Sequence, residues 1–246
     1  MTLGEGVEVE HLRVSYNDIH NLIKKNTPTI AAEFDPDLLV AIGGGGFFPA
    51  RVMRTFLRAQ TEHKALQIQA IGLSLYEPIE GLSFLQLHEL LTSASPGTSV
   101  NQIGHEVIRT QWLGADSGKM LLGRKILIVD EVDDTRKTLH YAHSELLKDV
   151  EEELAKHPES EQPALRAATK FAVFVVHNKL KPKLAELPAD LQYFAGQTVE
   201  DVWLDYPWES MHVTLIVPCP LAELVRLTRD IESHDSLAAA DKQQKV

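Results

Sequence analysis

The sequence has little cysteine and no long apolar run. Its single cysteine, Cys219, excludes a disulfide within the chain. No stretch approaches the roughly 18 uninterrupted apolar residues that a membrane-spanning helix needs. The first residues do not combine a basic start with an apolar run, as a secretory signal does. We therefore expect a soluble protein in the reducing cytoplasm, with no membrane partner.

Positive charge is also scarce. The chain has 24 Lys and Arg residues against 35 Asp and Glu residues, which gives a formal net charge of -11. Nucleic-acid binding draws its sequence-independent affinity from Lys and Arg that displace counterions, so we expect no nucleic-acid partner. Any anion that binds must be small and held locally. The hydrophobic content of 44% is enough for one sizeable core.

Short apolar segments alternate with amphipathic helices along the chain. One helix is predicted from residue 15 to near Pro28, and another from Thr135 to about Leu147. Segment 77–104 is predicted to be an insertion, and segment 151–170 a surface excursion, because both are polar and contain proline. The alternation predicts an α/β fold with a parallel twisted sheet flanked by helices. The predicted strands are 37–42, 66–75, 126–129 and 171–176.

The segment 126–138, ILIVDEVDDTRKT, carries most of the functional information. Its apolar strand places Asp130 and Glu131 at the carboxyl end of a sheet, where open α/β folds bind ligands and where carboxylates can accept hydrogen bonds from paired hydroxyls. Residues 134–138 then start a helix whose free amides and dipole favour an anion. An acidic turn that only complements the helix dipole fits the same spacing, as does a phosphoacceptor aspartate of a receiver-like fold.

This segment resembles the binding motif for phosphoribosyl pyrophosphate (PRPP) in type I phosphoribosyltransferases: an apolar strand, two acids, then Asp-Thr-x-x-Thr. The resemblance implies that Asp130 and Glu131 bind the ribose 2′ and 3′ hydroxyls, directly or through Mg2+. It also implies that Asp134 is the general base at the purine N7. The residues implied in binding the PRPP 5′-phosphate are Asp134, Thr135, Arg136, Lys137 and Thr138.

One residue of the motif departs from the family. The family usually has glycine where this chain has Arg136. A side chain tolerates a positive φ poorly, because Cβ then approaches the following carbonyl oxygen. We therefore expect either a locally different loop at Arg136 or an ordinary helical conformation.

A run of four glycines, 43–46, lies between the first predicted strand and a helix. Glycine lets backbone amides approach phosphates closely, and a plain flexible turn is the alternative. The segment AIGGGGFFPAR resembles the pyrophosphate loop of bacterial xanthine-guanine phosphoribosyltransferases, which have a basic residue at the position of Gly44. Positive charge must then come from elsewhere, for which Arg51 and Arg109 are candidates. The glycines implied in pyrophosphate binding are Gly44, Gly45 and Gly46.

The segment 202–209, VWLDYPWE, resembles the purine-binding hood of the same enzymes. The resemblance implies that Trp203 stacks on the purine and that the carbonyl of Leu204 accepts a hydrogen bond from an exocyclic amine. Core packing is the ordinary alternative for tryptophan. Residues 74–76, Ser-Leu-Tyr, resemble more weakly the root of a loop that closes over the active site.

The loop after the strand 171–176 supplies the last candidate. Lys179 is the residue that the resemblance assigns to the purine O6, and His177 competes for the same position in the alignment. The neighbouring Lys181 and Lys183 favour a different interpretation, in which the segment is a solvated basic loop.

The resemblance runs through nearly the whole chain and is strongest for fungal hypoxanthine-guanine phosphoribosyltransferases. It implies purine salvage: hypoxanthine or guanine, with xanthine a further candidate, reacts with PRPP to give the nucleoside 5′-monophosphate and pyrophosphate. Mg2+ and a homodimer are also implied. A non-enzymatic regulator of the same fold that senses PRPP or a nucleotide is the alternative. The implied organisation is a single domain over 1–246, with a core at about 15–178, a small hood subdomain from about 179–218 with the N-terminal segment, and a frayed tail at 237–246.

Overall fold

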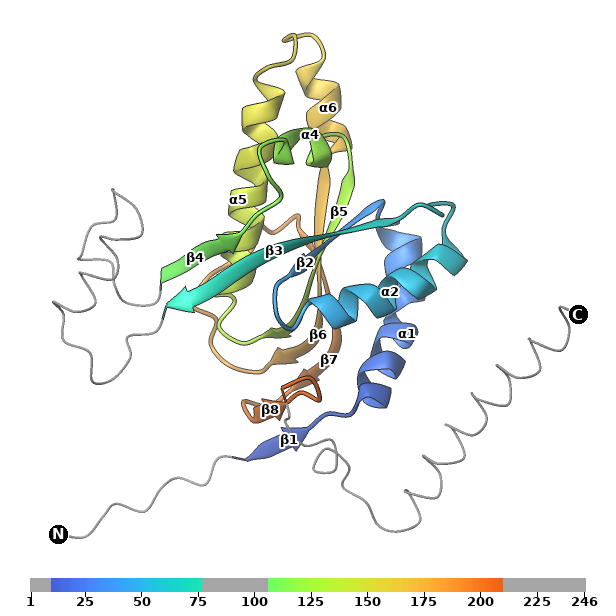
Figure 1. The fold of residues 1–246 in the computed structure, drawn as a ribbon, viewed down its shortest axis with the longest axis vertical. Helices are drawn as coiled ribbons and strands as arrows, with labels where there is room; N and C mark the ends of the chain where they lie inside the picture. The colour runs from blue at the N-terminus through green and yellow to red at the C-terminus, as the bar shows by residue number, and fades with distance from the viewer. Residues whose placement is uncertain (1–9, 77–105, 210–246) are drawn as a thin grey trace, which may run out of the picture. The chain divides into compact units, whose positions relative to one another are not determined.

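The computed structural model describes residues 10–76 and 106–209, and a six-stranded sheet lies at its centre (Figure 1). The strand order is β4-β3-β2-β5-β6-β7. Neighbouring strands run parallel, except that β4 is antiparallel to β3. The predicted α/β sheet is confirmed, with one antiparallel strand added at its edge. The strands are β2 Leu38–Ile42, β3 Gln67–Tyr76, β4 Glu106–Gln111, β5 Lys125–Asp133, β6 Lys170–Lys179 and β7 Gln192–Val199.

Helices cover both faces of the sheet, with α1 and α2 on one side and α4 and α5 on the other (Figure 1). The prediction that the first helix ends near Pro28 is wrong, because α1 continues through this proline to Glu33. Burial of Ile23 and Ile30 on either side of Pro28 offsets the backbone hydrogen bond that proline cannot donate. The helices are α1 Tyr16–Glu33, α2 Phe47–Gln60, α4 Ser117–Leu121, α5 Lys137–Leu154 and α6 Gln162–Ala168.

Two parts of the segment 147–199 differ from the sequence prediction. The helix α5 extends past Leu147 to Leu154, because Val150 and Leu154 on its last turns are buried. The strand β7 was not predicted. Its sequence, QYFAGQTV, lies at the edge of the sheet and is half-buried, so it lacks the continuous apolar run that identifies the central strands. The helix α6 buries no residue, as expected for a surface excursion.

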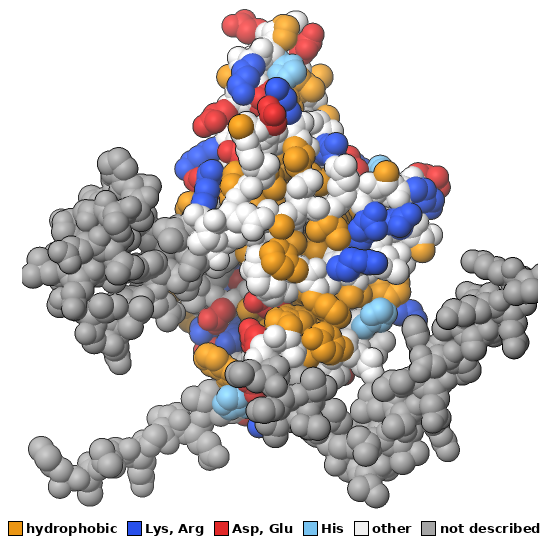
Figure 2. Space-filling model, in the orientation of Figure 1, with side chains coloured by type: hydrophobic (Ala, Val, Ile, Leu, Met, Phe, Trp, Pro, Cys, Tyr) orange, Lys and Arg blue, Asp and Glu red, His pale blue; other side chains and the backbone are white. Residues whose placement is uncertain are grey.

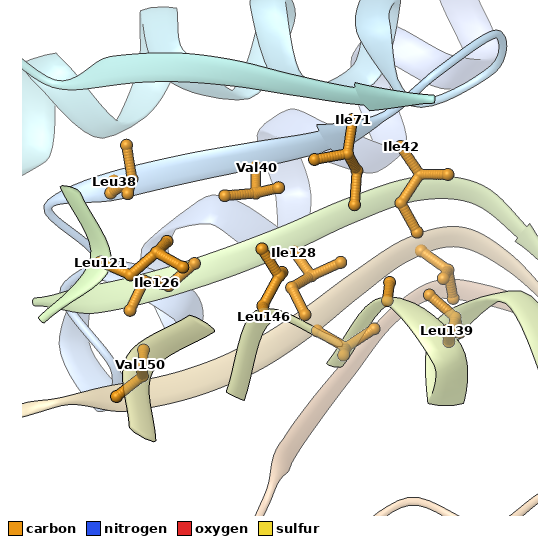
Figure 3. Close-up of a cluster of buried hydrophobic side chains, with 13 residues drawn as sticks. Leu38, Val40, Ile42, Ile71, Leu121, Ile126, Ile128, Leu139, Leu146 and Val150 are labelled. Carbon is orange, nitrogen blue, oxygen red and sulfur yellow. The ribbon is translucent and has the colours of Figure 1, made fainter. Parts of the chain in front are cut away.

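The core lies between the sheet and α5 (Figure 3). Alternate residues of β2 and β5 point to this face, including Val40 and Ile128, and they meet Leu146 of α5. Their neighbours Leu39 and Leu127 are equally buried. Burial of both faces explains why these strands are continuous apolar runs in the sequence. Parallel pairing with β2 and β6 sets the direction of β5, whose carboxyl end carries the acidic residues of the predicted site.

A second compact unit comprises residues 11–16 and the chain from 204 onward, of which 204–209 are described. In it β1 (His11–Arg13) pairs with β8 (Trp203–Asp205), and the Val14 N–H donates to the Asp205 carbonyl at 3.1 Å. The Tyr206 and Trp208 rings stack with centroids 4.8 Å apart. Residues 179–199 end β6 and form β7 of the main sheet, and the division into core and hood stays a prediction.

Two expectations fall on parts of the chain outside the described residues: the insertion 77–104 and the tail 237–246. Among the residues that are described, no helix combines the length and the apolar character needed to cross a membrane.

Candidate active site

A cavity of about 220 Å³ lies at the carboxyl end of β5, the strand between β2 and β6. Its wall is formed by the consecutive residues 130–136, with Thr138 and Leu139 of α5 and Gly43 after β2. The structure therefore brings together the residues predicted to bind the ribose and the 5′-phosphate, except Lys137, whereas the predicted pyrophosphate residues Gly44, Gly45 and Gly46 are not part of this lining. An open α/β sheet places its ligands at this edge.

Two adjacent carboxyl groups, those of Asp130 and Glu131, line one side of the cavity. Asp130 is buried, and the backbone N–H of Glu131 donates to its Oδ1 atom at 2.9 Å. Burial, followed by the charge of Glu131, raises the pKa of Asp130 well above its usual range. The pair therefore favours a partner that brings positive charge or hydrogen-bond donors.

The oxygen ligands of this pair suit Mg2+, which prefers carboxylates and usually completes its coordination with substrate oxygens and water. Within the described ranges, no group of three or more His, Cys, Asp or Glu residues could hold a metal ion by itself. Asp130 and Glu131 therefore fit a cation that is shared with a phosphorylated ligand better than a metal site built from protein alone.

The glycine run makes direct contact with the acidic pair. A Cβ atom added to Gly45 would lie 1.7 Å from Cδ of Glu131, and one added to Gly46 would lie 2.4 Å from the carbonyl oxygen of Val129. Gly44 has φ of 81°, which side chains rarely adopt. Gly46 is thus required by close approach to the backbone and Gly44 by its own backbone conformation, whereas a side chain at Gly45 would meet only the movable carboxylate of Glu131.

The turn 134–136 connects β5 to α5, which begins at Lys137, two residues later than Thr135. Arg136 is the N-cap and has φ of 68° and ψ of -5°. Neither expectation for this residue is met, because Arg136 adopts the left-handed conformation that glycine has without strain. Its Nε and Nη2 atoms donate to Oδ2 of Asp133 at 3.0 and 2.8 Å.

The carboxylate of Asp134 is paired with two lysines. Its Oδ1 atom lies 3.0 Å from Nζ of Lys181 and 3.6 Å from Nζ of Lys179. Both ammonium groups also contact Oδ1 of Asp201, at 3.1 and 3.7 Å. The hydrogen bond that Lys181 donates to Asp134 raises the pKa of Lys181. The structure thus places Lys179 next to Asp134 and adds Lys181 and Asp201, which were not predicted.

Lys183 is a further residue that sequence analysis missed. Its Nζ atom donates to the carbonyl oxygens of Asp133, Asp134 and Lys179, at 2.8, 3.0 and 3.0 Å. The interpretation of this segment as a solvated basic loop is therefore wrong. No local pattern could have found Lys183, because β6 ends at Lys179 and the chain bends at residues 180 and 181, so alternate spacing does not imply a shared face there.

The two candidates for the pyrophosphate charge lie outside the cavity lining. Arg51 is exposed on α2, where basic side chains gather (Figure 2), and its Nη1 atom donates to Oγ1 of Thr55 at 2.8 Å. Arg109 pairs with Glu145 and lies 4.1 Å from the ring centroid of Trp112. Neither arginine is placed by the structure to meet a ligand in this cavity.

The base-binding candidates differ in exposure. Trp203 is 58% exposed, so the alternative that it is core packing is wrong, whereas Leu204 is buried. His177 is buried within β6, and burial lowers its pKa to about 4, which makes it a neutral core histidine. The side chains of residues 74–76 lie outside the described part of the structure.

Known proteins resemble the chain over almost its whole length. A scan against protein-family models finds no match. The chain is 44% identical to the hypoxanthine-guanine phosphoribosyltransferase of Schizosaccharomyces pombe, covering 93% of this chain and 94% of the relative. It is 43% identical to xanthine phosphoribosyltransferase 1 of Saccharomyces cerevisiae, covering 95% and 97%. The chain belongs to the purine phosphoribosyltransferases.

Solved structures share the fold of the chain. The phosphoribosyltransferase resembles a hypothetical protein from Neisseria gonorrhoeae with bound ppGpp, with a TM-score of 0.61, 30% identity and coverage of 85% of this chain and 95% of that one. A purine phosphoribosyltransferase from Pyrococcus horikoshii matches with a TM-score of 0.52 and 17% identity over 83% and 97%, a likeness of fold.

The phosphoribosyltransferase is a glycosyltransferase of purine salvage with the type I fold, as the sequence resemblance predicted. Family membership decides against the receiver-like alternative, in which Asp130 would be a phosphoacceptor. The carboxylates line a cavity together, an arrangement that complementing the dipole of α5 would not by itself require.

Replacing Gly45 with alanine tests the contact between the glycine run and the acidic pair. The new methyl group would displace the Glu131 carboxylate, which lies at the end of a flexible side chain, so folding should be retained. We expect Mg-PRPP to bind about 10- to 100-fold more weakly, the loss that follows from one charged hydrogen bond. Isothermal calorimetry measures it. Unchanged affinity would show that Glu131 does not contact the ligand.

The buried His177 gives a pH dependence of stability. Its pKa is about 4 in the folded phosphoribosyltransferase and about 6.5 when unfolded, so the unfolded chain binds more protons between these values. As far as His177 determines it, the free energy of unfolding should be highest above about pH 6.5 and should fall by about 3 kcal/mol as the pH drops to 4. Urea unfolding across this range measures it. His177→Gln should flatten this part of the plot of unfolding free energy against pH. Parallel plots for the wild type and the variant would contradict the lowered pKa of His177.

Proposed function

We propose that this phosphoribosyltransferase joins hypoxanthine or guanine, with xanthine a further candidate, to the ribose of PRPP and releases pyrophosphate. The product is the nucleoside 5′-monophosphate. The observation that carries the proposal is that Asp130, Glu131 and the turn 134–136 line one cavity beside Gly43. The names of the two fungal relatives support the choice of bases.

In this proposal the acidic pair binds the ribose, and the start of α5 binds the 5′-phosphate. Asp130 and Glu131 accept hydrogen bonds from the ribose hydroxyls. The backbone N–H groups of the first turn of α5 have no acceptor within the helix, so together with Thr135 and Thr138 they donate to the 5′-phosphate. The amides of Gly44, Gly45 and Gly46 bind the pyrophosphate, which can approach the backbone closely because glycine has no side chain.

The purine is recognised by Asp134 and Lys179. The purine N7 and O6 atoms are neighbours on one edge of the base, and the two side chains lie 3.6 Å apart. Asp134 accepts the N7 proton, and Lys179 donates to O6. Lys181 must leave Asp134 for this to happen, and Asp201, already 3.1 Å away, is its alternative partner.

Mg2+ is the proposed cofactor, supported by the hard oxygen donors of Asp130 and Glu131 and by the raised pKa of Asp130. When bound, it would stabilise the negative charge that develops on the leaving pyrophosphate. Stacking of Trp203 on the base, hydrogen bonding to the carbonyl of Leu204, a homodimer and a cytoplasmic location are further parts of the proposal. They rest on the sequence resemblance and, for Trp203, on its exposed ring.

A base panel tests the proposal. The protein is mixed with Mg-PRPP and with hypoxanthine, guanine or xanthine, and nucleotide formation is followed by absorbance. We expect turnover with at least one of the first two bases. The alternative is a regulator that binds PRPP or a nucleotide. The likeness to the Neisseria protein with bound ppGpp is consistent with this alternative. A regulator would bind Mg-PRPP in calorimetry and form no nucleotide.

Replacing Asp134 with asparagine should lower kcat by about 10²- to 10⁴-fold, because general acid–base catalysis contributes this much. Asp201→Asn is the matched control, since Asp201 binds the same two lysines. It should lose less than about tenfold, as for an exposed ion pair. Steady-state kinetics at saturating substrate measure both. Equal losses in the two variants would show that the lysines, and not Asp134, carry the effect.

A further inference from the structure

Arg136 lies in the turn proposed to bind the phosphate, and its backbone conformation is unfavourable for a residue that has a side chain. Its φ of 68° lies in the left-handed region. For residues other than glycine this conformation disfavours the turn by about 5- to 30-fold. The turn 134–136 must nevertheless keep this shape, because it leads the chain from β5 into the first turn of α5. Some interaction of Arg136 itself must offset the cost.

The offsetting interaction is visible at Asp133. Its Oδ2 atom accepts hydrogen bonds from Nε and Nη2 of Arg136, at 3.0 and 2.8 Å, and from the hydroxyl of Tyr193, at 2.8 Å. The Asp133 side chain is fully buried, where charge-assisted hydrogen bonds are strong and an unpaired carboxylate would be costly. Arg136 is therefore held by a buried carboxylate through two hydrogen bonds, and the other oxygen of that carboxylate, Oδ1, lies 3.5 Å from Nζ of Lys183.

Tyr193 completes the arrangement from β7. The guanidinium of Arg136 lies 5.0 Å from the centroid of the Tyr193 ring, within the range of a cation–π contact. Burial and the neighbouring Asp133 raise the pKa of Tyr193, so its hydroxyl keeps the proton that it donates. We call Asp133, Arg136 and Tyr193 the Asp133 clamp. Its members join the turn to a strand 60 residues away in sequence.

A second set of bonds fixes the same turn from outside. Lys183 donates to the carbonyl oxygens of Asp133 and Asp134, and the Leu184 N–H donates to the carbonyl of Thr135 at 3.0 Å. Lys183 also donates to the carbonyl of Lys179, which carries the proposed contact to the purine O6. The turn is therefore built into the protein before any ligand arrives.

We propose that Arg136 is a positioning residue, whose ion pair with Asp133 stabilises the left-handed turn that presents the amides of the phosphate-binding site. The inference rests on the proposed function. It assigns to the guanidinium no contact with the phosphate. Glycine adopts the left-handed conformation without strain because it lacks a side chain. Arg136 is held in the same conformation by its ion pair with the buried carboxylate of Asp133.

The experiment compares Arg136→Ala with Arg136→Gly, which lose the same guanidinium and differ in their tolerance of φ near 68°. Calorimetry with ribose 5-phosphate measures the turn directly, because this probe has the 5′-phosphate but neither base nor leaving group. We expect the alanine variant to bind about 5- to 30-fold more weakly than the wild type. The glycine variant should recover most of that loss. Equal weakening in both variants, or wild-type binding by the alanine variant, overturns the proposal.

Asp133→Asn and Tyr193→Phe keep the inference testable if an Arg136 variant does not fold, which thermal unfolding reports. Each should weaken ribose 5-phosphate binding, the phenylalanine variant less because it removes a single hydrogen bond. Wild-type binding by Asp133→Asn would also overturn the proposal. In turnover, Arg136→Ala should raise KM for PRPP more than it lowers kcat, the reverse of Asp134→Asn.

The two proposals fail in different ways. A wild-type protein that binds ribose 5-phosphate with the expected order of variants, but forms no nucleotide, contradicts the proposed function and leaves the role of Arg136 intact. A wild-type protein that forms nucleotide, while its alanine and glycine variants bind the probe equally, contradicts the role of Arg136 alone.

Discussion

Four carboxyl groups within five residues, those of Asp130, Glu131, Asp133 and Asp134, set the constraint on which the site depends. Like charges at this spacing raise one another's energy, and burial at the end of β5 raises it further. The fold gives them different partners. Asp133 binds Arg136 and Tyr193, while Asp134 faces lysines. Asp130 instead has a raised pKa beside Glu131, which suits a cation that arrives with the substrate.

The segment that follows β6 supplies most of the balancing charge, and its three lysines differ in what they bind. Lys179 and Lys181 bridge the carboxylates of Asp134 and Asp201, whereas Lys183 binds backbone carbonyl oxygens. One short segment after β6 thus reaches both the proposed base site and the turn 134–136. In the proposed function, recognition of the base is therefore linked to the shape of the turn through this stretch of chain.

Local patterns were enough to find the central strands and the site residues that are consecutive in sequence. The strands β2 and β5 are buried on both faces, so each is a short apolar run, and the acidic residues follow directly on one of them. The pattern fails where tertiary packing decides. The helix α1 passes through Pro28 because its flanking isoleucines are buried, and β7 is an edge strand without an apolar run.

The sequence by itself determined the α/β class, the family and the adjacency of Asp130, Glu131 and 134–138, because these depend on periodicity and on residues close together in the chain. Only the tertiary structure decided how Arg136 replaces glycine and which cations meet Asp134. Those interactions join β5 to residues about 50 to 60 positions further along, as Lys183 and Tyr193 meet Asp133. No local pattern encodes such contacts, because the sheet creates them when β5, β6 and β7 align.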